Sequence, residues 1–301
     1  MVLFVFLSNL RYINYMNKDY IVILFYKFID IDNPKELADA YKLKCAELNI
    51  KGRMLVAEEG INGTFEGERN DIEKLKQYIK SDTRFSDMLI KESAGNGNAF
   101  PKVKIKVRDE VVTLGAGRFD VKNETAAELS PKELEEWYAK DEDFVVLDLR
   151  NDYEIASGRF DKTIDPKLEN FRDLPKKLKE LEGLKKKKVL TVCTGGIRCE
   201  KATCLLKREG FENVYQLKDG IHTYMKEYPG KNFKGTLFVF DNRLVTDVVD
   251  TKEKEIVGKC VFCNSNTETY YSDDRIRPSR KVLCCDSCYE INKSYLRASI
   301  N

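Results

Sequence analysis

Histidine is nearly absent from this 301-residue chain, which contains only His222. A single imidazole excludes a HExxH zinc site, a 2-His-1-carboxylate iron centre and any metal site that needs several histidines. The sequence also lacks the GxGxxG loop that binds dinucleotides, so no organic cofactor is identified from a motif. The reactive groups must therefore be sought among other side chains.

The chain also lacks a large net charge of either sign, because it has 52 Lys and Arg residues and 50 Asp and Glu residues. This balance excludes a globally basic nucleic-acid binder but leaves room for local basic patches. No apolar run reaches the roughly 18 residues of a membrane span, and the short run Met1–Leu7 has neither a basic flank nor a cleavage site. Nine unevenly placed cysteines favour thiol chemistry or metal binding over a secreted disulfide framework. We therefore expect a cytoplasmic protein without membrane contact.

The first predicted domain covers residues 16–115. Its expected elements are, in order, a strand at Tyr20–Ile29, a helix at Pro34–Leu48, strands at Arg53–Ala57 and Thr64–Phe65 around a turn at Glu59–Gly63, a helix at Asp71–Lys80 and a strand at Lys102–Thr113. The order βαββαβ is typical of the ferredoxin-like α+β fold, which names no function by itself. Because Met16 would open this domain cleanly, we interpret residues 1–15 as a candidate for a mis-assigned start.

The second predicted domain, residues 130–230, has an α/β pattern. A capping box at Ser130–Glu133 opens a helix, and short apolar strands are expected at Phe144–Leu149, Lys188–Val192 and Asn213–Leu217. Helical segments alternate with these strands, which predicts a parallel sheet with helices on both faces. The remaining region, residues 231–301, holds five of the nine cysteines.

The loop that follows Lys188–Val192 has the residues of a reactive thiol site. Cys193 ends the strand, the helix that follows begins with Arg198 and Cys199, and the loop between them consists of Thr194, Gly195, Gly196 and Ile197. Glycines let backbone amides converge as an anion-binding nest, and the helix dipole and Arg198 add positive potential. These features favour the thiolate, so Cys193 is predicted to be a nucleophile with a low pKa.

Several motifs carry a resemblance to a known family. Val146–Glu154 (VLDLRNDYE) is similar to the Asp-x-Arg-x-x-x-Glu signature of the rhodanese domain. More specifically, Cys193–Lys201 (CTGGIRCEK) resembles the rhodanese-related tRNA uridine hydroxylases. Matching stretches in the same order are AEEGINGT at Ala57–Thr64, KVRDEVVTLG at Lys106–Gly115, RNDYE at Arg150–Glu154 and LFVFDNRLV at Leu237–Val245. The resemblance covers about Tyr20–Cys288, and in that family a ferredoxin-like or acylphosphatase-like domain precedes the rhodanese-like domain.

This resemblance implies an enzyme that hydroxylates the wobble uridine 34 of tRNA to 5-hydroxyuridine. It implies molecular oxygen as co-substrate and tRNA, rather than DNA, as partner; partner proteins are not identified. The loop alone also fits a thiosulfate-type sulfurtransferase that carries sulfur as a persulfide on Cys193. A third reading is a zinc-containing RNA-binding protein with an inactive rhodanese domain, against which the retained Cys193 and Arg198 count.

The cysteines near the end of the chain have the spacing of a zinc ribbon. Two Cys-x2-Cys pairs, Cys260 with Cys263 and Cys285 with Cys288, are separated by about twenty residues. Four thiolates fill a tetrahedral shell, so we expect a structural rather than a catalytic zinc ion. Cys284 is then the spare cysteine.

A row of positively charged side chains is the candidate surface for binding a partner. Strand alternation places Lys102, Lys104, Lys106 and Arg108 on one face. Such a row either is a solvated sheet face or follows a phosphate backbone, and the resemblance to a tRNA enzyme favours RNA binding.

Four other features are either open between two interpretations or interpreted as structural. Cys199 is a resolving thiol or a small packing residue. Cys204, at helical spacing, is expected in the core. The stretch Glu58–Thr64 is a turn or part of a substrate cleft. His222 is expected to cap or pack a helix.

Overall fold

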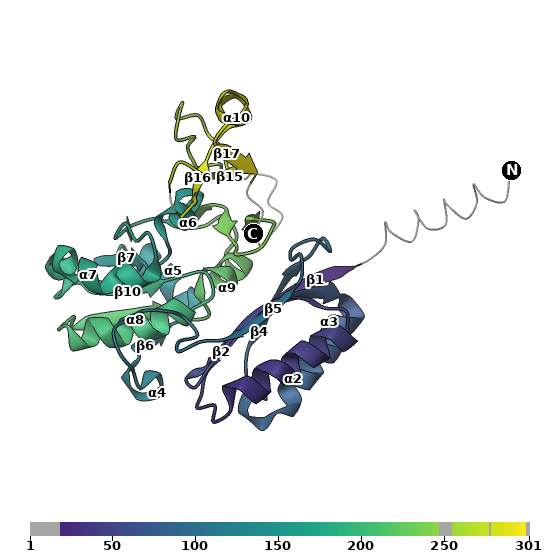
Figure 1. Ribbon diagram of the computed structural model, residues 1–301. Coiled ribbons are helices and arrows are strands. Elements are labelled where there is room, and N and C mark those ends of the chain that lie inside the picture. Colours follow the sequence, from purple (N-terminus) through teal and green to yellow (C-terminus); the bar gives the residue numbers. More distant parts are fainter. Residues whose placement is uncertain (1–18, 247–254, 277, 299–301) are drawn as a thin grey trace, which may run out of the picture. The chain divides into compact units, whose positions relative to one another are not determined.

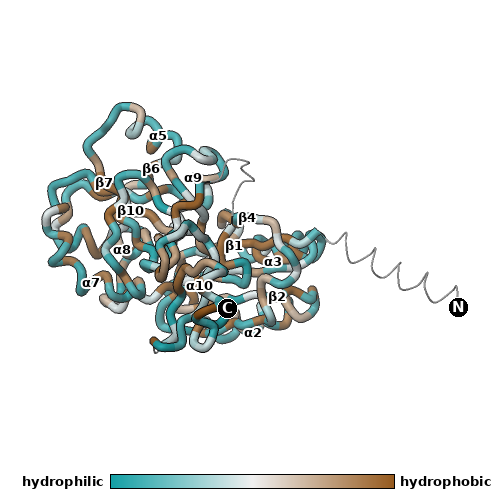
Figure 2. The backbone as a smooth tube through the Cα atoms, turned by 90° about the horizontal axis from the view of Figure 1, so that it is seen from above, coloured by the Kyte–Doolittle hydropathy of each residue, from teal (hydrophilic) through white to brown (hydrophobic). Residues whose placement is uncertain are grey.

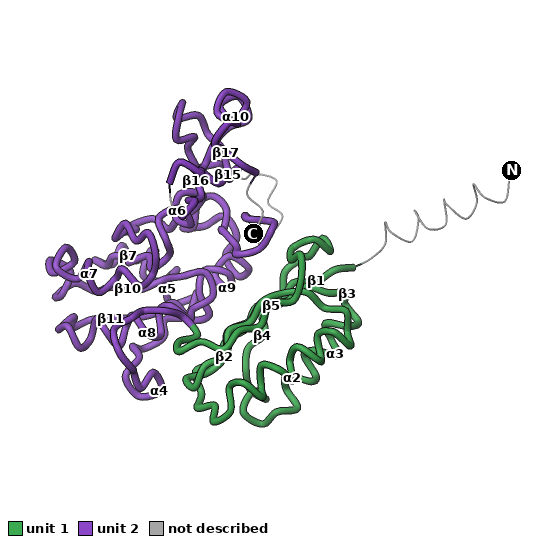
Figure 3. Tube along the Cα trace, viewed as in Figure 1, with its two compact units in different colours: residues 1–111 green, residues 112–301 purple. Residues whose placement is uncertain are grey.

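The computed structural model describes residues 19–246, 255–276 and 278–298, and the start expected near Met16 lies outside them. The chain divides into two compact units, one ending at Val111 and one beginning at Val112 (Figure 3). Each unit is built on its own five-stranded sheet. None of the described helices is both long enough and apolar enough to cross a membrane.

The first unit is an antiparallel sheet with one helix-covered face and one added parallel edge strand. Its elements are β1 (Tyr20–Phe28), α2 (Pro34–Glu47), β2 (Lys51–Ala57), β3 (Gly60–Glu68), α3 (Arg69–Ser81), a 3₁₀ turn (Thr83–Phe85), β4 (Ile90–Ala94) and β5 (Val103–Val107). The sheet order is β4-β1-β3-β2-β5. Apolar side chains of α2 and α3 pack on those of β1, β2 and β3, and both helices lie along one face of the sheet (Figure 1).

The predicted ferredoxin-like order is confirmed, but its fourth strand is not the predicted one. The fourth strand is β4, which pairs antiparallel with β1, whereas β5 pairs parallel with β2 as an extra edge strand. The sequence of β4, IKESA, has no apolar run because only one of its side chains is fully buried, and this is why it was missed. The strand expected at Lys102–Thr113 is shorter, spanning only Val103–Val107.

The turn predicted at Glu59–Gly63 is also shorter in the structure. It consists of Glu58 and Glu59, and β3 begins at Gly60. Gly60 has a φ of +144°, and a Cβ there would lie 2.0 Å from the Lys27 carbonyl oxygen of the neighbouring strand. A Cβ on Gly63 would lie 2.6 Å from the Phe25 ring. These two glycines therefore permit close packing between strands. In the sequence alone, glycines that do this look the same as glycines in a turn.

The second unit contains the predicted parallel sheet, in the order β6 (Ala127–Leu129), β11 (Asn213–Leu217), β10 (Lys188–Val192), β7 (Phe144–Asp148) and β9 (Thr163–Ile164). Its helices are α4 (Val121–Glu124), α5 (Pro131–Ala139), α6 (Asp152–Ala156), α7 (Leu174–Lys177), α8 (Ile197–Arg208) and α9 (Gly220–Glu227), with 3₁₀ segments at Phe171–Asp173 and Leu178–Leu184. Helices α5 and α9 pack on one face of the sheet and α8 on the other (Figure 1). The predicted capping box is present, since the Ser130 hydroxyl accepts from Glu133 N and the Glu133 carboxylate accepts from Ser130 N.

Short antiparallel pairs complete the second unit. Two of these are β8 (Gly158–Phe160) with β12 (Phe233–Gly235) and β13 (Leu237–Phe238) with β14 (Val245–Thr246). In the cysteine-rich part, an antiparallel three-stranded sheet has the order β16 (Arg280–Leu283), β15 (Tyr270–Asp273) and β17 (Leu296–Ala298), and α10 (Asp286–Asn292) lies between β16 and β17 in the chain. Hydrophobic residues follow the central strands of both units, such as β1 and β10, in the hydropathy view (Figure 2).

Candidate active site and metal site

The loop between β10 and α8 wraps its backbone around the Cys193 sulfur. Cys193 is fully buried at the end of β10, and the Gly196 N–H donates to its Sγ at 3.2 Å. Gly196 has a φ of +106°, a conformation that side chains rarely adopt, so glycine is needed at this position. The predicted nest is therefore formed, with at least one amide directed at the sulfur.

The start of helix α9 packs against this loop, a contact that the sequence did not predict. Ile221 N donates to the Cys193 carbonyl at 3.0 Å, and His222 N donates to the Thr194 carbonyl at 3.1 Å. Gly220 has a φ of +71°, and a Cβ there would lie 2.7 Å from backbone atoms of Gly195 and Gly196. Gly220 thus lets the two backbones approach, and His222, buried in α9 as expected, also fixes the loop through its amide.

The surroundings of Cys193 stabilise its thiolate. Burial by itself raises the pKa of Cys193, but the Cys199 thiol, the Arg198 charge and the amides of both residues outweigh burial and lower the pKa to about 5. The pKa of Cys199 moves in the opposite direction, raised by burial and by its hydrogen bond to Cys193. At neutral pH the pair therefore holds one negative charge on Cys193 and one proton on Cys199.

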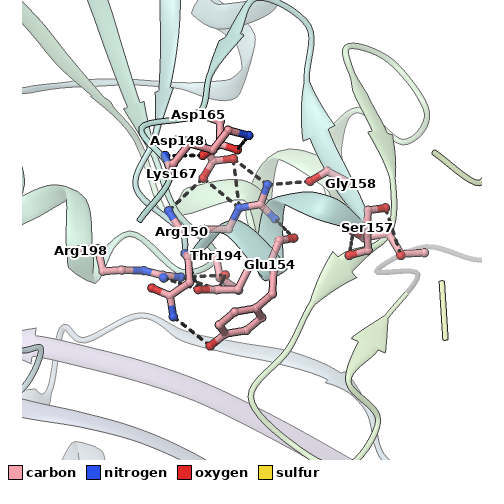
Figure 4. A network of polar contacts seen from close by, with 12 residues as sticks. Asp148, Arg150, Glu154, Ser157, Gly158, Asp165, Lys167, Thr194 and Arg198 are labelled. Atoms are coloured by element: carbon pink, nitrogen blue, oxygen red, sulfur yellow. Dashed lines mark hydrogen bonds and ion pairs between the residues drawn. The ribbon is translucent and has the colours of Figure 1, made fainter. Parts of the chain in front are cut away.

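Arg198 is held in place by an ion pair with Glu154 of α6. Its Nη1 and Nη2 lie 2.6 and 2.8 Å from the two Glu154 carboxylate oxygens, and Nη2 is 3.3 Å from the Thr194 hydroxyl (Figure 4). Burial lowers the pKa of Arg198, but Glu154 raises it further, so the guanidinium stays charged. Arg198 is thus a fixed charge beside the loop rather than a mobile side chain.

A second buried ion pair anchors the segment that carries Glu154. Arg150 and Asp148, both fully buried, are joined by bonds from Arg150 Nε and Nη2, and Nη2 also donates to the Gly158 carbonyl at 2.7 Å (Figure 4). Arg150 Nη1 donates to the Glu154 carbonyl at 3.3 Å. The Asp-x-Arg-x-x-x-Glu signature therefore acts as one unit that directs the Glu154 carboxylate at Arg198.

The remaining residues of the loop region lie close to Cys193 or in the core. Ile197 is half-buried at the start of α8, and Cys199 is the third residue of this helix. Cys204 is buried, as expected of a core residue, and its Sγ donates to the Glu200 carbonyl at 3.1 Å. Cys199 is buried and interacts with Cys193, which fits both readings given above, a resolving thiol and a packing residue.

The stretch Glu58–Thr64 contacts Val111, the last residue of the first unit. The Glu59 carboxylate accepts from Val111 N at 2.8 Å, and the Asn62 amide donates to the Val111 carbonyl at 3.0 Å. These bonds satisfy both polar backbone groups of one residue. They give the two side chains a structural role where the chain leaves the first unit.

The predicted basic row lies on the surface of the first unit. Lys102, Lys104, Lys106 and Arg108 are all exposed, while Ile105 between them is buried. The row follows the edge strand β5. Within the described part of the chain, none of the three lysines forms an ion pair, so their charges are open to a partner.

The four cysteines predicted to bind zinc come together. Their Sγ atoms all lie within 4.8 Å of one another, and those of Cys263 and Cys285 are 3.6 Å apart. Four sulfurs at about 2.3 Å from a tetrahedral zinc ion lie about 3.8 Å apart, so the geometry and the donor set both fit zinc. Cys284 is buried beside the cluster, and its Sγ donates to the Cys285 carbonyl, in keeping with a spare cysteine.

Three family models match consecutive parts of the chain. Residues 20–111 match the UPF0176 acylphosphatase like domain, residues 130–227 match the Rhodanese-like domain, and residues 234–298 match Rhodanase C-terminal. The matches follow the two sheets and the cysteine-rich part in order.

Relatives named tRNA uridine(34) hydroxylase cover nearly the whole chain. The protein of Cytophaga hutchinsonii is 39% identical over 91% of this chain and 87% of its own length. That of Bacillus licheniformis is 42% identical over 94% of this chain and 87% of its own length, and that of Wolbachia pipientis is 37% identical over 91% and 99%. The chain therefore belongs to the tRNA uridine(34) hydroxylase family.

Proposed function

We propose that this protein hydroxylates uridine 34 of tRNA to 5-hydroxyuridine, with molecular oxygen as co-substrate and Cys193 as the reactive group. The names of its relatives support the reaction, and the loop between β10 and α8 supports the residue. In this proposal Arg198 and Cys199 assist Cys193, and Thr194, Gly195, Gly196 and Ile197 form the anion-binding loop.

The observation that carries the assignment of Cys193 is the set of groups around its buried sulfur. A buried sulfur with an amide at 3.2 Å, a thiol donor and a fixed guanidinium nearby is built to hold negative charge. The same loop would stabilise a thiolate, a persulfide or an oxygenated sulfur species, because each places negative charge at the same position. Cys199 holds a proton that it can donate to such a group.

The other regions supply binding and support in the proposed function. Residues 16–115 form the domain whose basic row contacts tRNA phosphates, residues 130–230 form the catalytic domain, and residues 231–301 hold a structural zinc ion. Zinc would be bound by the four clustered thiolates, and a closed shell of this kind supplies folding energy rather than a reactive site. The protein acts where tRNA is found, in the cytoplasm.

The decisive experiment is mass spectrometry of tRNA nucleosides from cells that carry the wild-type gene, no gene, or a Cys193→Ser variant. Serine keeps the size of the side chain but stays protonated, so we expect 5-hydroxyuridine only with the wild type. Cys204→Ser serves as the matched control, since Cys204 is buried in the same helix as Arg198 but lies about two turns beyond the loop, where its Sγ bonds the Glu200 carbonyl, and it should retain the modification.

Two outcomes would replace the proposal. If tRNA is unmodified in every strain while the purified wild type, but not Cys193→Ser, moves sulfur from thiosulfate, the protein is a sulfurtransferase. If Cys193→Ser matches the wild type in both assays and still binds tRNA, the rhodanese-like domain is inactive and the protein is an RNA-binding module.

A further inference from the structure

We propose that the exposed ring of Phe240 is the surface on which the uracil base of the substrate stacks beside the Cys193 loop. The inference rests on the proposed function, because it names the part of the site that holds the base. It assigns a binding role to a residue that takes no part in the thiolate chemistry.

Phe240 is exposed although it lies two residues beyond the end of the buried strand β13. Its side chain is 40% exposed, whereas Phe238, two residues earlier in β13, is 1% exposed. Single exposed apolar side chains are common on protein surfaces, so it is the place of Phe240 beside Arg198 and the Cys193 loop that sets this ring apart. One exposed ring is also far too small for a protein interface, which buries about 1,000 Å² or more.

The ring is held in place from behind by other aromatic side chains. The Phe238 ring lies 5.4 Å from that of Phe240 in an edge-to-face arrangement, and it also contacts the rings of Tyr153 at 5.2 Å and Tyr270 at 5.1 Å. Such a cluster fixes the orientation of Phe240. A fixed aromatic ring loses little freedom when a base stacks on it, as binding sites for single-stranded RNA require.

Phe240 is connected to the reactive loop through one side chain. The Arg198 guanidinium carbon lies 5.7 Å from the centre of the Phe240 ring. Arg198 in turn lies 3.3 Å from the Thr194 hydroxyl, next to Cys193 in the chain. The buried guanidinium, with its side chain 8% exposed, therefore links the ring to the loop, and the exposed part of the Phe240 ring is the surface on which an unpaired base can stack.

A uracil fits this surface better than a charged or an aliphatic ligand. Its π-face is flat and uncharged, and every base can stack on an aromatic ring. The Arg198 charge is already balanced by Glu154, so the surface does not select for an anion beyond the thiolate site. Replacing a stacking aromatic with alanine weakens binding of one base by roughly 5- to 150-fold.

The test measures how tightly the full-length protein binds two anticodon stem-loop RNAs that differ only at position 34, one with uridine and one with an abasic ribose. We expect the wild type and Phe240→Tyr to prefer the uridine RNA by the same ratio. Phe240→Leu, which keeps the apolar volume but not the ring, should lose this preference by about 5-fold or more while binding the abasic RNA as the wild type does.

Phe262→Leu is the matched control. Phe262 is 38% exposed, and the Arg275 guanidinium carbon lies 5.8 Å from the centre of its ring. It resembles Phe240 in both respects but lies in the cysteine-rich part. It should keep the preference for uridine. A Phe240→Leu protein that retains the wild-type ratio, or a wild type with no preference, overturns the stacking proposal. Nucleoside analysis separates this from the proposed function, since 5-hydroxyuridine in wild-type but not Cys193→Ser cells leaves the reaction standing.

Discussion

Glu154→Gln should destabilise the second unit and misplace Arg198, although Glu154 does not touch the reactive sulfur. The Glu154 side chain is fully buried and that of Arg198 is 8% exposed. The two groups share a pair of hydrogen bonds at 2.6 and 2.8 Å. Glutamine is nearly the same size, so the substitution removes the charge and one acceptor and leaves the packing intact.

The size of the effect follows from burial. Removing one partner of a buried ion pair leaves the other charge without compensation and costs about 3–5 kcal/mol. Glutamine still offers one acceptor oxygen to the guanidinium, so we expect about 3 kcal/mol, the lower end of that range. Removing both charges should cost less than the sum of the two single changes, because the double variant Glu154→Gln/Arg198→Met leaves no charge unpaired.

Urea unfolding followed by tryptophan fluorescence reports the stability of the second unit, in which Glu154 and Arg198 lie. Trp137 is the only tryptophan of the chain, and its ring packs on Phe144 and Tyr215 in the second unit, each with centres 5.2 Å apart. The control is Glu180→Gln, which breaks an ion pair with Lys177 that is largely exposed. That change should cost less than about 1 kcal/mol.

Two results would refute the reasoning about Glu154. One is a loss below about 1 kcal/mol, equal to that of the exposed control. The other is strict additivity of the Glu154 and Arg198 changes, within about 0.5 kcal/mol, since groups that do not interact give additive effects. A stable Glu154→Gln protein with a full level of 5-hydroxyuridine would also show that Arg198 needs no positioning partner.

Four further outcomes are expected. The thiolate absorbance of wild type minus Cys193→Ser should fall as the pH drops through about 5, because a lowered pKa keeps the thiolate charged above it; a midpoint near the ordinary thiol value would contradict this. Purified protein should contain one zinc ion, and a chelator should loosen the cysteine-rich part before the rest; less than about half an equivalent, with all four thiols reactive, excludes the site. Changing Lys104 and Lys106 to Glu should weaken tRNA binding and reduce its salt slope by about 0.7–0.9 per lost phosphate contact, whereas unchanged affinity means a solvated face. Gly220→Ala should cost about 2–4 kcal/mol from strain and overlap with the loop, but Gly210→Ala, with a similar φ of +84° and open space, only about 1–2 kcal/mol; equal losses would remove the role of close approach.

The sequence predicted what is local and missed what depends on distant contacts. The Cys193 loop could be predicted because strand, glycines, arginine and helix follow one another within a few residues. The cluster of four cysteines could be predicted because metal-binding pairs have a fixed short spacing. The fourth strand, β4, escaped because an edge strand with one buried side chain has no apolar run.

The partner of Arg198 illustrates the same limit. The motif around Arg150 was visible in the sequence, but the bond from Glu154 to Arg198 spans 44 positions and arises only when α6 and α8 meet in the fold. The approach of Gly220 to the loop likewise depends on where α9 begins. No periodicity or spacing encodes either contact, so only resemblance or structure could supply them.

The position of α6 connects the cysteine-rich part of the chain to the Cys193 loop. Three consecutive residues of α6 face different partners: Asp152 pairs with Arg280 of β16, the Tyr153 carbonyl accepts from the Tyr270 hydroxyl of β15, and Glu154 holds Arg198. A helix of five residues has little stability alone, so its position depends on these contacts. Strand β16 ends at Leu283, directly before Cys284 and Cys285, so removal of a metal ion bound by the cysteine cluster should reach Arg198 through α6.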